Sequence, residues 1–326
     1  MSYLRGEDIN IGFGIEDPAS RGTYVEPQIW VPGRSPAALI SEPELVEIRE
    51  TRITGMSAQD SEIVQKKSTG DFEFNLRVES FGFLVKSWLG GDVTTSGIES
   101  GVYEHTFIVG DDAQHPTLSA GLVLSQDYEY ANTIVKSIAI RTPVDDVVNA
   151  TANLLSPNET KRVGVAFAPT FDTKDYYFRH QDVTIKLADD EAGLDAADAL
   201  CLKTFELSGD NNSRLNQCIG QIIPGDVLSL LQDMSIEFSA DYLDETYRDL
   251  IIDGGQKALR IEMERSDIDY AGGNHPKITF DFPKVKLATR TQDRPIEDTV
   301  IDNCTARVFA APTLKVVNER ANYNHA

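Results

Sequence analysis

The feature that most constrains this chain is an alternation of apolar and polar residues with a period of two. In the first clear case Phe72, Phe74 and Leu76 alternate with Asp71 and Glu73. Strict alternation is typical of strands that place one face on a core and leave the other in water, as antiparallel sheets do. We therefore predict a mainly β protein, with strands in the segments 71–78, 148–154, 182–187, 235–241, 259–264 and 277–282.

The last two of these segments carry local signals for a hairpin and a bulge. Gly272 and Gly273 lie between them and can supply the positive φ of a hairpin turn. After Pro283 the apolar phase slips to Val285 and Leu287. Proline cannot donate a hydrogen bond to a neighbouring strand, so a bulge or a sheet edge is expected there.

Helical periodicity is confined to one short segment in each half of the chain. At 80–89 the apolar residues fall on one stripe, and Gly90 and Gly91 provide a stop. The segment 190–200 has a weaker stripe, and Asp189, Asp190 and Glu191 suit its N-terminus. We predict two short packed helices with the stripes Phe81, Leu84, Val85 and Trp88 in the first and Leu194, Ala197 and Leu200 in the second.

The length of 326 residues predicts two domains, because a single core rarely grows beyond about 250–300 residues. The turn-rich segment 156–175 is the expected junction, which places the domains at 1–160 and 161–326. No residue-level repeat is visible, so an internal duplication is only a hypothesis. Two polar segments, 41–70 and 90–102, are expected to be projecting loops.

The charge is strongly acidic, with 52 acidic residues against 30 basic ones and a formal net charge of −22. Such a chain will not bind nucleic acid by neutralising phosphates, which needs clustered lysine and arginine. Two interpretations stay open: the acidity keeps the protein soluble, or it forms a wall past which a nucleic acid slides without sticking.

Cysteine usage and hydropathy exclude several other classes of protein. Cys201, Cys218 and Cys304 are few, odd in number and far apart, which predicts neither a disulfide framework nor a zinc site and suggests a reducing cytoplasm. The first residues lack the apolar stretch of a signal peptide, and no segment has the ~20 apolar residues of a membrane helix.

Motifs that carry chemistry are missing or incomplete. Gly12 and Gly14 begin a dinucleotide-type glycine motif, but Asp17 stands where the third glycine belongs. Asp267 and Asp269 faintly resemble a calcium loop out of register. The histidines form no metal-binding pair and are expected to be ordinary surface or turn residues; they are His105, His115, His180, His275 and His325. We predict no catalytic, cofactor-binding or metal-binding residues, no cofactor, and no enzymatic activity.

The N-terminal sequence IGFGIEDPASRGTYVEPQIWVPGRS resembles the start of siphophage tail tube (major tail) proteins. The shared pattern is Gly-x-Gly-x-Glu from Gly12, a Gly-Thr-Tyr step at 22–24, then Pro27 and an aromatic-proline strand with Trp30 and Pro32. A charged segment, a strand at 71–78 and a helix ending in WLGG follow in the family's order. The turn at 224–226, the strand at 235–241, LDETYRD and PKITFDFPKVK extend the likeness over most of the chain.

The resemblance implies two tandem tail-tube-type β-sandwich or barrel domains, each with one short packed helix. Copies would join their strands around an electronegative lumen, with trimeric rings favoured over hexameric ones, and rings would stack through the segment 41–70. Viral DNA would pass through without specific binding. Further implied partners are a tape measure protein and terminator or baseplate proteins. The implied place is the phage tail of the virion, after assembly in the host cytoplasm and without a membrane.

Two alternatives remain beside the tube subunit. One is a terminator or baseplate-type ring protein on the same fold, and the other is a β-sandwich hydrolase built on paired carboxylates. Trp30 and Trp88 favour a structural role, as a strand anchor and a helix core residue. Four carboxylates are expected to carry charge in the lumen or on the outer surface: Glu237, Asp241, Glu262 and Glu264.

Overall fold

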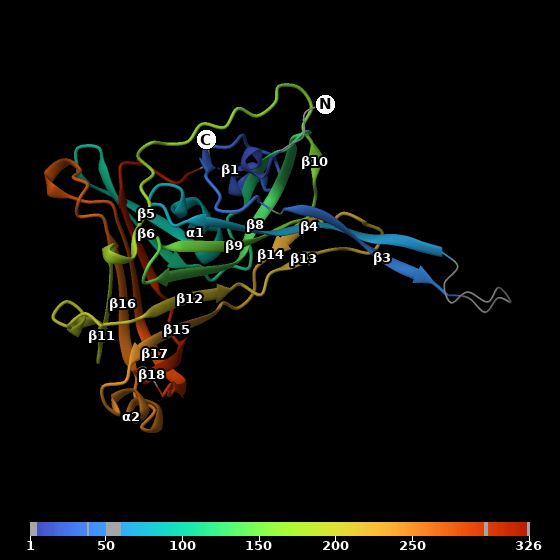
Figure 1. Cartoon of the computed structure of the whole chain (residues 1–326). Helices are drawn as coiled ribbons and strands as arrows, with labels where there is room; N and C mark the ends of the chain where they lie inside the picture. Colours follow the sequence, from blue (N-terminus) through green and yellow to red (C-terminus); the bar gives the residue numbers. More distant parts are fainter. Residues whose placement is uncertain (1–4, 38, 50–59, 297–298, 325–326) are drawn as a thin grey trace.

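The computed structural model describes residues 5–37, 39–49, 60–296 and 299–324, so residues 50–59 of the predicted loop and His325 lie outside the described part. The protein is mainly β, with antiparallel pairing throughout its long strands and two α-helices (Figure 1). Short 3-10 turns lie at Gly6–Asp8, Pro18–Ser20, His180–Asp182, Glu191–Gly193 and Ala271–Gly273.

A seven-stranded sheet, here called the large sheet, runs through both halves of the chain. Its order is β4–β9–β8–β12–β15–β18–β17, and every neighbouring pair is antiparallel. All six strand segments predicted from alternation correspond to strands of this sheet or the next one, although the segment predicted at 71–78 ends at Asn75. The bounds are β4 Asp60–Asn75, β8 Tyr128–Pro143, β9 Asn149–Ser156, β12 Thr204–Asp210, β15 Asp233–Asp241, β17 Lys277–Asp293 and β18 Ile301–Val308.

A second sheet shares the first part of β17 with the large sheet. Its order is β11–β16–β17–β19–β6–β5. Between Phe282 and Val285 strand β17 has one residue more than β16 opposite it, so the bulge predicted at Pro283 is confirmed. Strands β16 and β17 form the predicted hairpin, with Gly272 and Gly273 at positive φ. The other bounds are β5 Gly90–Glu99, β6 Val102–Val109, β11 Val183–Ala188, β16 Lys257–Glu264 and β19 Thr313–Asn318.

The N-terminal strands form a third ladder, β2–β1–β7, which joins the start of β8. Strand β1 (Asn10–Ile15) contains the two glycines of the incomplete motif, and a Cβ on Gly12 would lie 2.8 Å from Pro27 and from the Trp30 ring. The glycines therefore allow close packing inside a sheet. Trp30 lies buried in β2 (Ile29–Val31), as expected of a strand anchor. Strand β7 spans Leu118–Val123, and the short β10 (Thr160–Lys161) pairs with the start of β8.

The first predicted helix is present and the second is not. α1 (Phe81–Leu89) is almost wholly buried, with Trp88 in the core and Gly90 ending it in the left-handed conformation. The segment 190–200 contains only a single 3-10 turn, in which the Asp190 side chain accepts from the Gly193 N–H. That prediction was wrong because an apolar stripe without a sustained helical period does not bury enough surface. The helix of the second half is α2 (Thr246–Ile252), which packs on β17.

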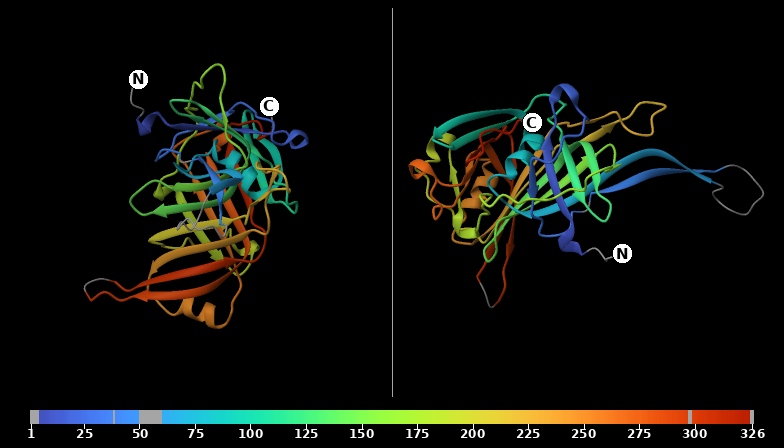
Figure 2. Two further views of the ribbon diagram at one scale, coloured as in Figure 1. Left: turned by 90° about the vertical axis from the view of Figure 1, so that its right-hand side faces the viewer. Right: turned by 90° about the horizontal axis from the view of Figure 1, so that it is seen from above.

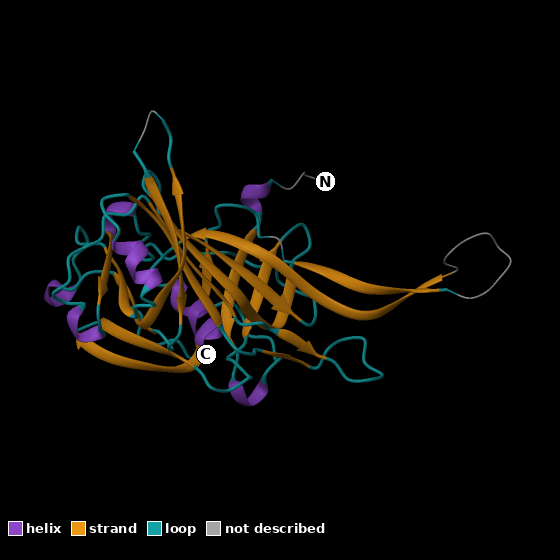
Figure 3. Cartoon of the chain, turned by 90° about the horizontal axis from the view of Figure 1, so that it is seen from below, coloured by secondary structure: helices purple, strands orange, loops and turns teal. Residues whose placement is uncertain are grey.

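The described residues of the predicted loop at 41–70 are instead two paired strands, here called the arm. Strand β3 (Ile40–Ile48) pairs with the first part of β4, and the arm projects from the body (Figures 1 and 3). Its strands carry mixed polar residues because both faces meet solvent over most of their length. The segment 90–102 was likewise mispredicted, since it forms β5 and the turn into β6.

A loop of the second half supports the arm. Strands β13 (Arg214–Asn216) and β14 (Asp226–Leu228) form a small ladder whose connecting loop lies along β4. The Lys66 N–H donates to the Ile222 carbonyl at 2.9 Å, and Gln217 Nε2 donates to the Val64 carbonyl at 2.8 Å. The arm is therefore a composite of two distant segments.

Packing between α1 and the large sheet leads to the first prediction. A Cβ on Gly209 of β12 would lie 2.3 Å from Trp88 Cζ2, so Gly209→Ala overpacks the core and is expected to lower the free energy of unfolding by about 1–3 kcal/mol. The matched control is Ser208→Ala on the opposite face, which removes one hydroxyl contact worth about 1 kcal/mol. Urea unfolding measures both, and an equal loss in the two variants would contradict the packing argument.

Candidate functional site

One face of the large sheet is polar from its first strand to its last. Directly paired residues form rows across the strands, and side chains in one row point to the same side. The central row spans all seven strands and runs through Asn75, Asn149, Arg141, Glu206, Glu237, Thr305 and Thr289. We call this surface the polar face.

The opposite face of the same strands is the core. Its residues are buried aliphatic and aromatic side chains that meet α1 and the second sheet, for example Phe72, Ile140, Leu207 and Ile236. The alternation recognised in the sequence is therefore the division between the core and the polar face. Because the core covers one face of the large sheet, the polar face is the face of this sheet that a partner or a passing molecule can reach.

The polar face is strongly acidic. Within the paired stretches its charged side chains are eight carboxylates against three cations, namely Asp71, Glu73, Glu206, Asp210, Asp233, Glu237, Asp241 and Asp293 against Arg141, Lys286 and Arg307. Arg141 is held by Glu206 at 2.9 Å, which reduces the free positive charge further. A phosphate backbone near this surface meets net repulsion.

Two rows place like charges directly opposite each other. Glu206 pairs with Glu237, and Asp210 pairs with Asp233. Directly opposed like charges destabilise a sheet pair, so folding stability alone does not account for them. They are the strongest sign that the charge of this face serves another purpose.

Between the charges the polar face has hydroxyl and amide groups in place of aromatic platforms. Ser208 and Ser235 share a hydrogen bond of 2.9 Å, and Thr204 and Ser239 share one of 2.6 Å. An open groove of about 750 Å³ crosses the face, lined largely by such residues. Short hydroxyls offer neither a stacking surface nor a cationic clamp to a nucleic acid.

The four carboxylates predicted to carry surface charge separate into two groups. Glu237 and Asp241 lie on the polar face, where Asp241 is bridged to Lys203 at 3.0 Å. Glu262 and Glu264 lie on β16 in the second sheet, and Lys277 bridges both at 2.9 and 3.1 Å. Glu206 and Asp210 were not predicted, because the alternation in the strand Thr204–Asp210 was not recognised.

The histidines contradict the prediction of ordinary surface or turn positions in two cases. His105 and His115 are buried, and burial lowers the pKa of both imidazoles. His115 lies against the end of α1, with Nδ1 3.2 Å from the Ser87 carbonyl. Asp267, in the incomplete calcium motif, is bound by Arg265 at 2.8 Å, which lowers the pKa of that carboxyl to about 2.

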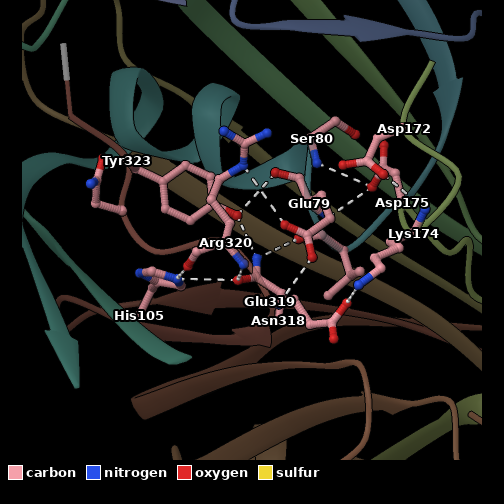
Figure 4. Close-up of polar contacts among 12 residues, drawn as sticks. Glu79, Ser80, His105, Asp172, Lys174, Asp175, Asn318, Glu319, Arg320 and Tyr323 are labelled. Atoms are coloured by element: carbon pink, nitrogen blue, oxygen red, sulfur yellow. Dashed lines mark hydrogen bonds and ion pairs between the residues drawn. The ribbon is translucent and has the colours of Figure 1, made fainter. Parts of the chain in front are cut away.

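A buried polar cluster at the start of α1 was not foreseen (Figure 4). The Asp175 carboxylate accepts from the backbone N–H groups of Glu79 at 2.7 Å and Ser80 at 3.2 Å, immediately before α1. Carboxylates near a helix N-terminus satisfy unpaired donors and complement the helix dipole. Asp175 belongs to the connecting segment 156–175, so the cluster anchors that connection to the first helix.

The C-terminal segment enters the same cluster. The Glu319 N–H donates to Glu79 Oε1 at 3.1 Å, and the Tyr323 hydroxyl donates to the Glu79 carbonyl at 2.9 Å. His105 Nε2 lies 2.8 Å from the Arg320 carbonyl (Figure 4). The cluster therefore links three segments that are far apart in the sequence: the start of α1 with Glu79, the connecting segment with Asp175, and the C-terminal segment with Glu319 and Tyr323. We call this cluster the clasp.

No described part of the chain points to a metal centre or a membrane span. Among residues 5–37, 39–49, 60–296 and 299–324, no three side chains of histidine, cysteine, aspartate or glutamate are grouped to hold a metal ion. None of the helices in these ranges is both long and apolar enough to cross a bilayer.

Comparison with known proteins identifies one family. A family model described as "Phage tail tube protein" matches residues 6–301. Among solved structures, the chain is similar to the SPP1 tail tube, at 13% identity over 45% of this chain and 81% of that one, with a TM-score of 0.28. It is also similar to an Hcp protein, at 10% identity over 40% of this chain and 96% of that one, with a TM-score of 0.24. No curated protein sequence matches.

The clasp leads to a prediction about pH. Burial raises the pKa of Glu79 from 4.5 to about 7, although the Glu319 N–H and Arg320 act against it. Since the folded state holds this proton more tightly, the contribution to stability is present below pH 4.5 and is lost as the pH rises through 7. Relative to wild type, Glu79→Gln should gain up to about 3 kcal/mol between pH 5 and pH 8.

Urea unfolding of both proteins across this pH range measures the gain. The control is Tyr323→Phe, which removes a hydroxyl from the same clasp and should lower the free energy of unfolding by a similar amount at each pH. A stability difference between Glu79→Gln and wild type that stays constant with pH would refute the buried-acid account.

Proposed function

Since this chain belongs to the family of phage tail tube proteins, we propose that its copies close into rings and that the rings stack into a hollow tube through which viral DNA passes. The observation that carries this proposal is the acidic polar face, a continuous seven-stranded surface with like charges placed opposite each other. The role is structural and not catalytic.

In this proposal the polar face lines the lumen. The core lies on the other side of the large sheet. In a ring whose subunits have the core on the outer side of this sheet, the carboxylates of the polar face therefore point into the lumen. Net negative charge along the wall repels the phosphates, and the wall has no aromatic platform to hold bases. DNA therefore passes without specific binding.

The arm is the proposed contact between stacked rings. Its strands expose apolar side chains to solvent: Leu45 is 56% exposed, Val46 50% and Ile63 41%. The supporting loop adds Ile219 and Ile222, which are also exposed. A projecting surface of this kind favours a protein partner, and a second copy in the next ring fits the family.

We further propose two tube-type units per chain, near 1–160 and 161–326, and trimeric rings in preference to hexameric ones. The large sheet supports this division, since β4, β8 and β9 come from the first half and the other four strands from the second. The proposed location is the phage tail, after assembly in the host cytoplasm. A tape measure protein and terminator or baseplate proteins are the proposed further partners.

A terminator or baseplate ring protein is the second candidate, and the arm favours the tube over it. A ring that never stacks has no use for an exposed apolar projection. The hydrolase alternative finds no support in the groove on the polar face, which is open and is lined mainly by threonine, asparagine, glutamate and arginine.

Electron microscopy of an arm-shortened variant separates these candidates. Glu44 and Gln65 are directly paired, so residues 45–64 can be replaced by an Asn-Gly turn without changing the register. Wild type is expected to form stacked tubes, and the shortened protein single rings with the same bore. Tubes of normal length from the shortened protein would exclude the arm as the stacking contact, and a strictly monomeric wild type would refute the tube.

Charge reversal tests the lumen. Asp233→Lys with Glu237→Lys places two cations on the polar face, removes two like-charge rows, and should let assembled tubes retain duplex DNA that is protected from nuclease. The control is Glu262→Lys with Glu264→Lys on the second sheet, where any bound DNA should stay open to nuclease. Equal protection in both variants would show that the polar face does not enclose the DNA.

A further inference from the structure

The strand order of the large sheet contains the same arrangement twice. With the arm strand included, the first half contributes β3–β4–β9–β8 and the second half β12–β15–β18–β17. In each half two paired strands come before the helix, β3 and β4 before α1 and β12 and β15 before α2. A later hairpin then places its second strand, β9 or β18, beside the second strand of that pair. In the sequence the two halves shared only a rough order of strands with one predicted helix each, and no residue-level repeat was visible.

The repeat extends to the pairing of individual residues. All seven residue pairs between β8 and β9 recur between β17 and β18, with both residues 152 positions later. At one end Ile134↔Leu155 corresponds to Lys286↔Arg307. At the other end Arg141↔Asn149 corresponds to Asp293↔Ile301. The bulge recurs as well, between Val135 and Ser137 in β8 and between Leu287 and Thr289 in β17. Bulges are specific local features, so their recurrence is strong evidence for equivalence.

The first two strands of each half also have equivalent pairs, although their positions are shifted by other numbers of residues. Ile40↔Thr69 in the arm matches Ser208↔Ser235, and Glu42↔Lys67 matches Asp210↔Asp233. Strand β3 is therefore the counterpart of β12, with positions shifted by 168 residues. Buried Leu39 correspondingly matches buried Leu207.

Within the chain, the two halves join through one antiparallel strand pair. In the order of the sheet, β8 is the outermost strand of the first half and β12 is the strand of the second half next to it. They pair with Ala139 opposite Ser208 and Ser137 opposite Asp210. Their counterparts β17 and β3 form the two margins of the sheet. Among the described residues, β18 is the only strand that pairs with Leu287–Asp293, and β4 is the only strand that pairs with β3.

From this correspondence we infer that β17 of one copy pairs antiparallel with β3 of the next copy, with Thr291 opposite Ile40 and Thr289 opposite Glu42. The inference rests on the proposed ring. It transfers the observed β8–β12 register to the junction between copies, so that every junction around the lumen has the same geometry. Both strands then continue the alternation of core and polar face across the boundary.

The side chains at the two margins agree with a protein contact there. Ile40 lies at the start of β3 with 58% of its surface exposed. In α2, which packs on β17, Ile252 is 64% exposed, and Leu243 in the segment that leads into α2 is 88% exposed. The β17–β18 hairpin also extends away from the body, as the red strands in Figure 2 show. An unpaired edge flanked by apolar residues is an aggregation hazard in a monomer and a docking site in a closed ring.

Disulfide trapping tests the register. In a background with Cys201→Ser and Cys218→Ser, the pairs Thr291→Cys with Ile40→Cys and Thr289→Cys with Glu42→Cys place cysteines directly opposite, within the Cα separation that a disulfide spans. Mild oxidation of assembled material should shift the monomer band on a non-reducing gel to a ladder of multimers. Thr291→Cys with Ser41→Cys is the mismatched control, because a slip of one residue points the two side chains to opposite faces.

Single variants give a second check. Neither Thr291→Cys nor Ile40→Cys alone should cross-link, but a mixture of the two proteins should give covalent dimers and nothing larger. Rings seen by electron microscopy without cross-links in either predicted pair, or with stronger cross-linking in the mismatched pair, would overturn this inference and leave the tube function intact. Absence of any ring would instead remove the proposed function on which it rests.

Discussion

Backbone hydrogen bonding along the large sheet is the constraint on which the rest of the structure depends. A sheet with one face on the core cannot end without leaving donors and acceptors unpaired at its outer strands. Inside the chain this problem is solved at the boundary between the halves, where β8 and β12 pair along seven residues each. The same pairing between copies, as proposed above, would close the sheet and remove its edges.

The clasp and the contacts at the end of α1 fix the position of the two halves relative to each other, so that β8 and β12 can pair. Asp175 fixes the connecting segment at the start of α1, and the C-terminal residues cover the same point. At the other end of the helix, Asn211 of the second half donates to the Trp88 carbonyl at 2.8 Å and to the Val135 carbonyl at 3.1 Å. One buried helix is therefore secured at both ends by segments distant in the sequence, which favours a rigid body over two units on a hinge.

Alternation was sufficient to predict six of the strands, the hairpin at Gly272 and Gly273, and the bulge after Pro283, because each depends on local geometry. It failed at 190–200, where a weak stripe was taken for a helix, and in the arm, whose strands have no buried face to impose a period. The internal repeat was invisible for a related reason. Equivalent positions such as Ile40 and Ser208 share a place in a ladder but no side-chain chemistry, and pairing registers leave no direct trace in one sequence.

In the proposed ring, enclosing the acidic polar face would cost electrostatic free energy, which contacts at the sheet margins would have to offset. Each added copy of the proposed ring would bring further carboxylates into the bore, and the like-charge rows Glu206–Glu237 and Asp210–Asp233 already oppose pairing within one chain. The proposed strand pairing at the margins and the proposed burial of apolar side chains in the arm would supply compensating free energy that does not depend on charge. In the proposed tube the wall can remain acidic enough to repel DNA, because closure would rely on backbone hydrogen bonds and apolar contacts, which salt and a passing polyanion do not disrupt.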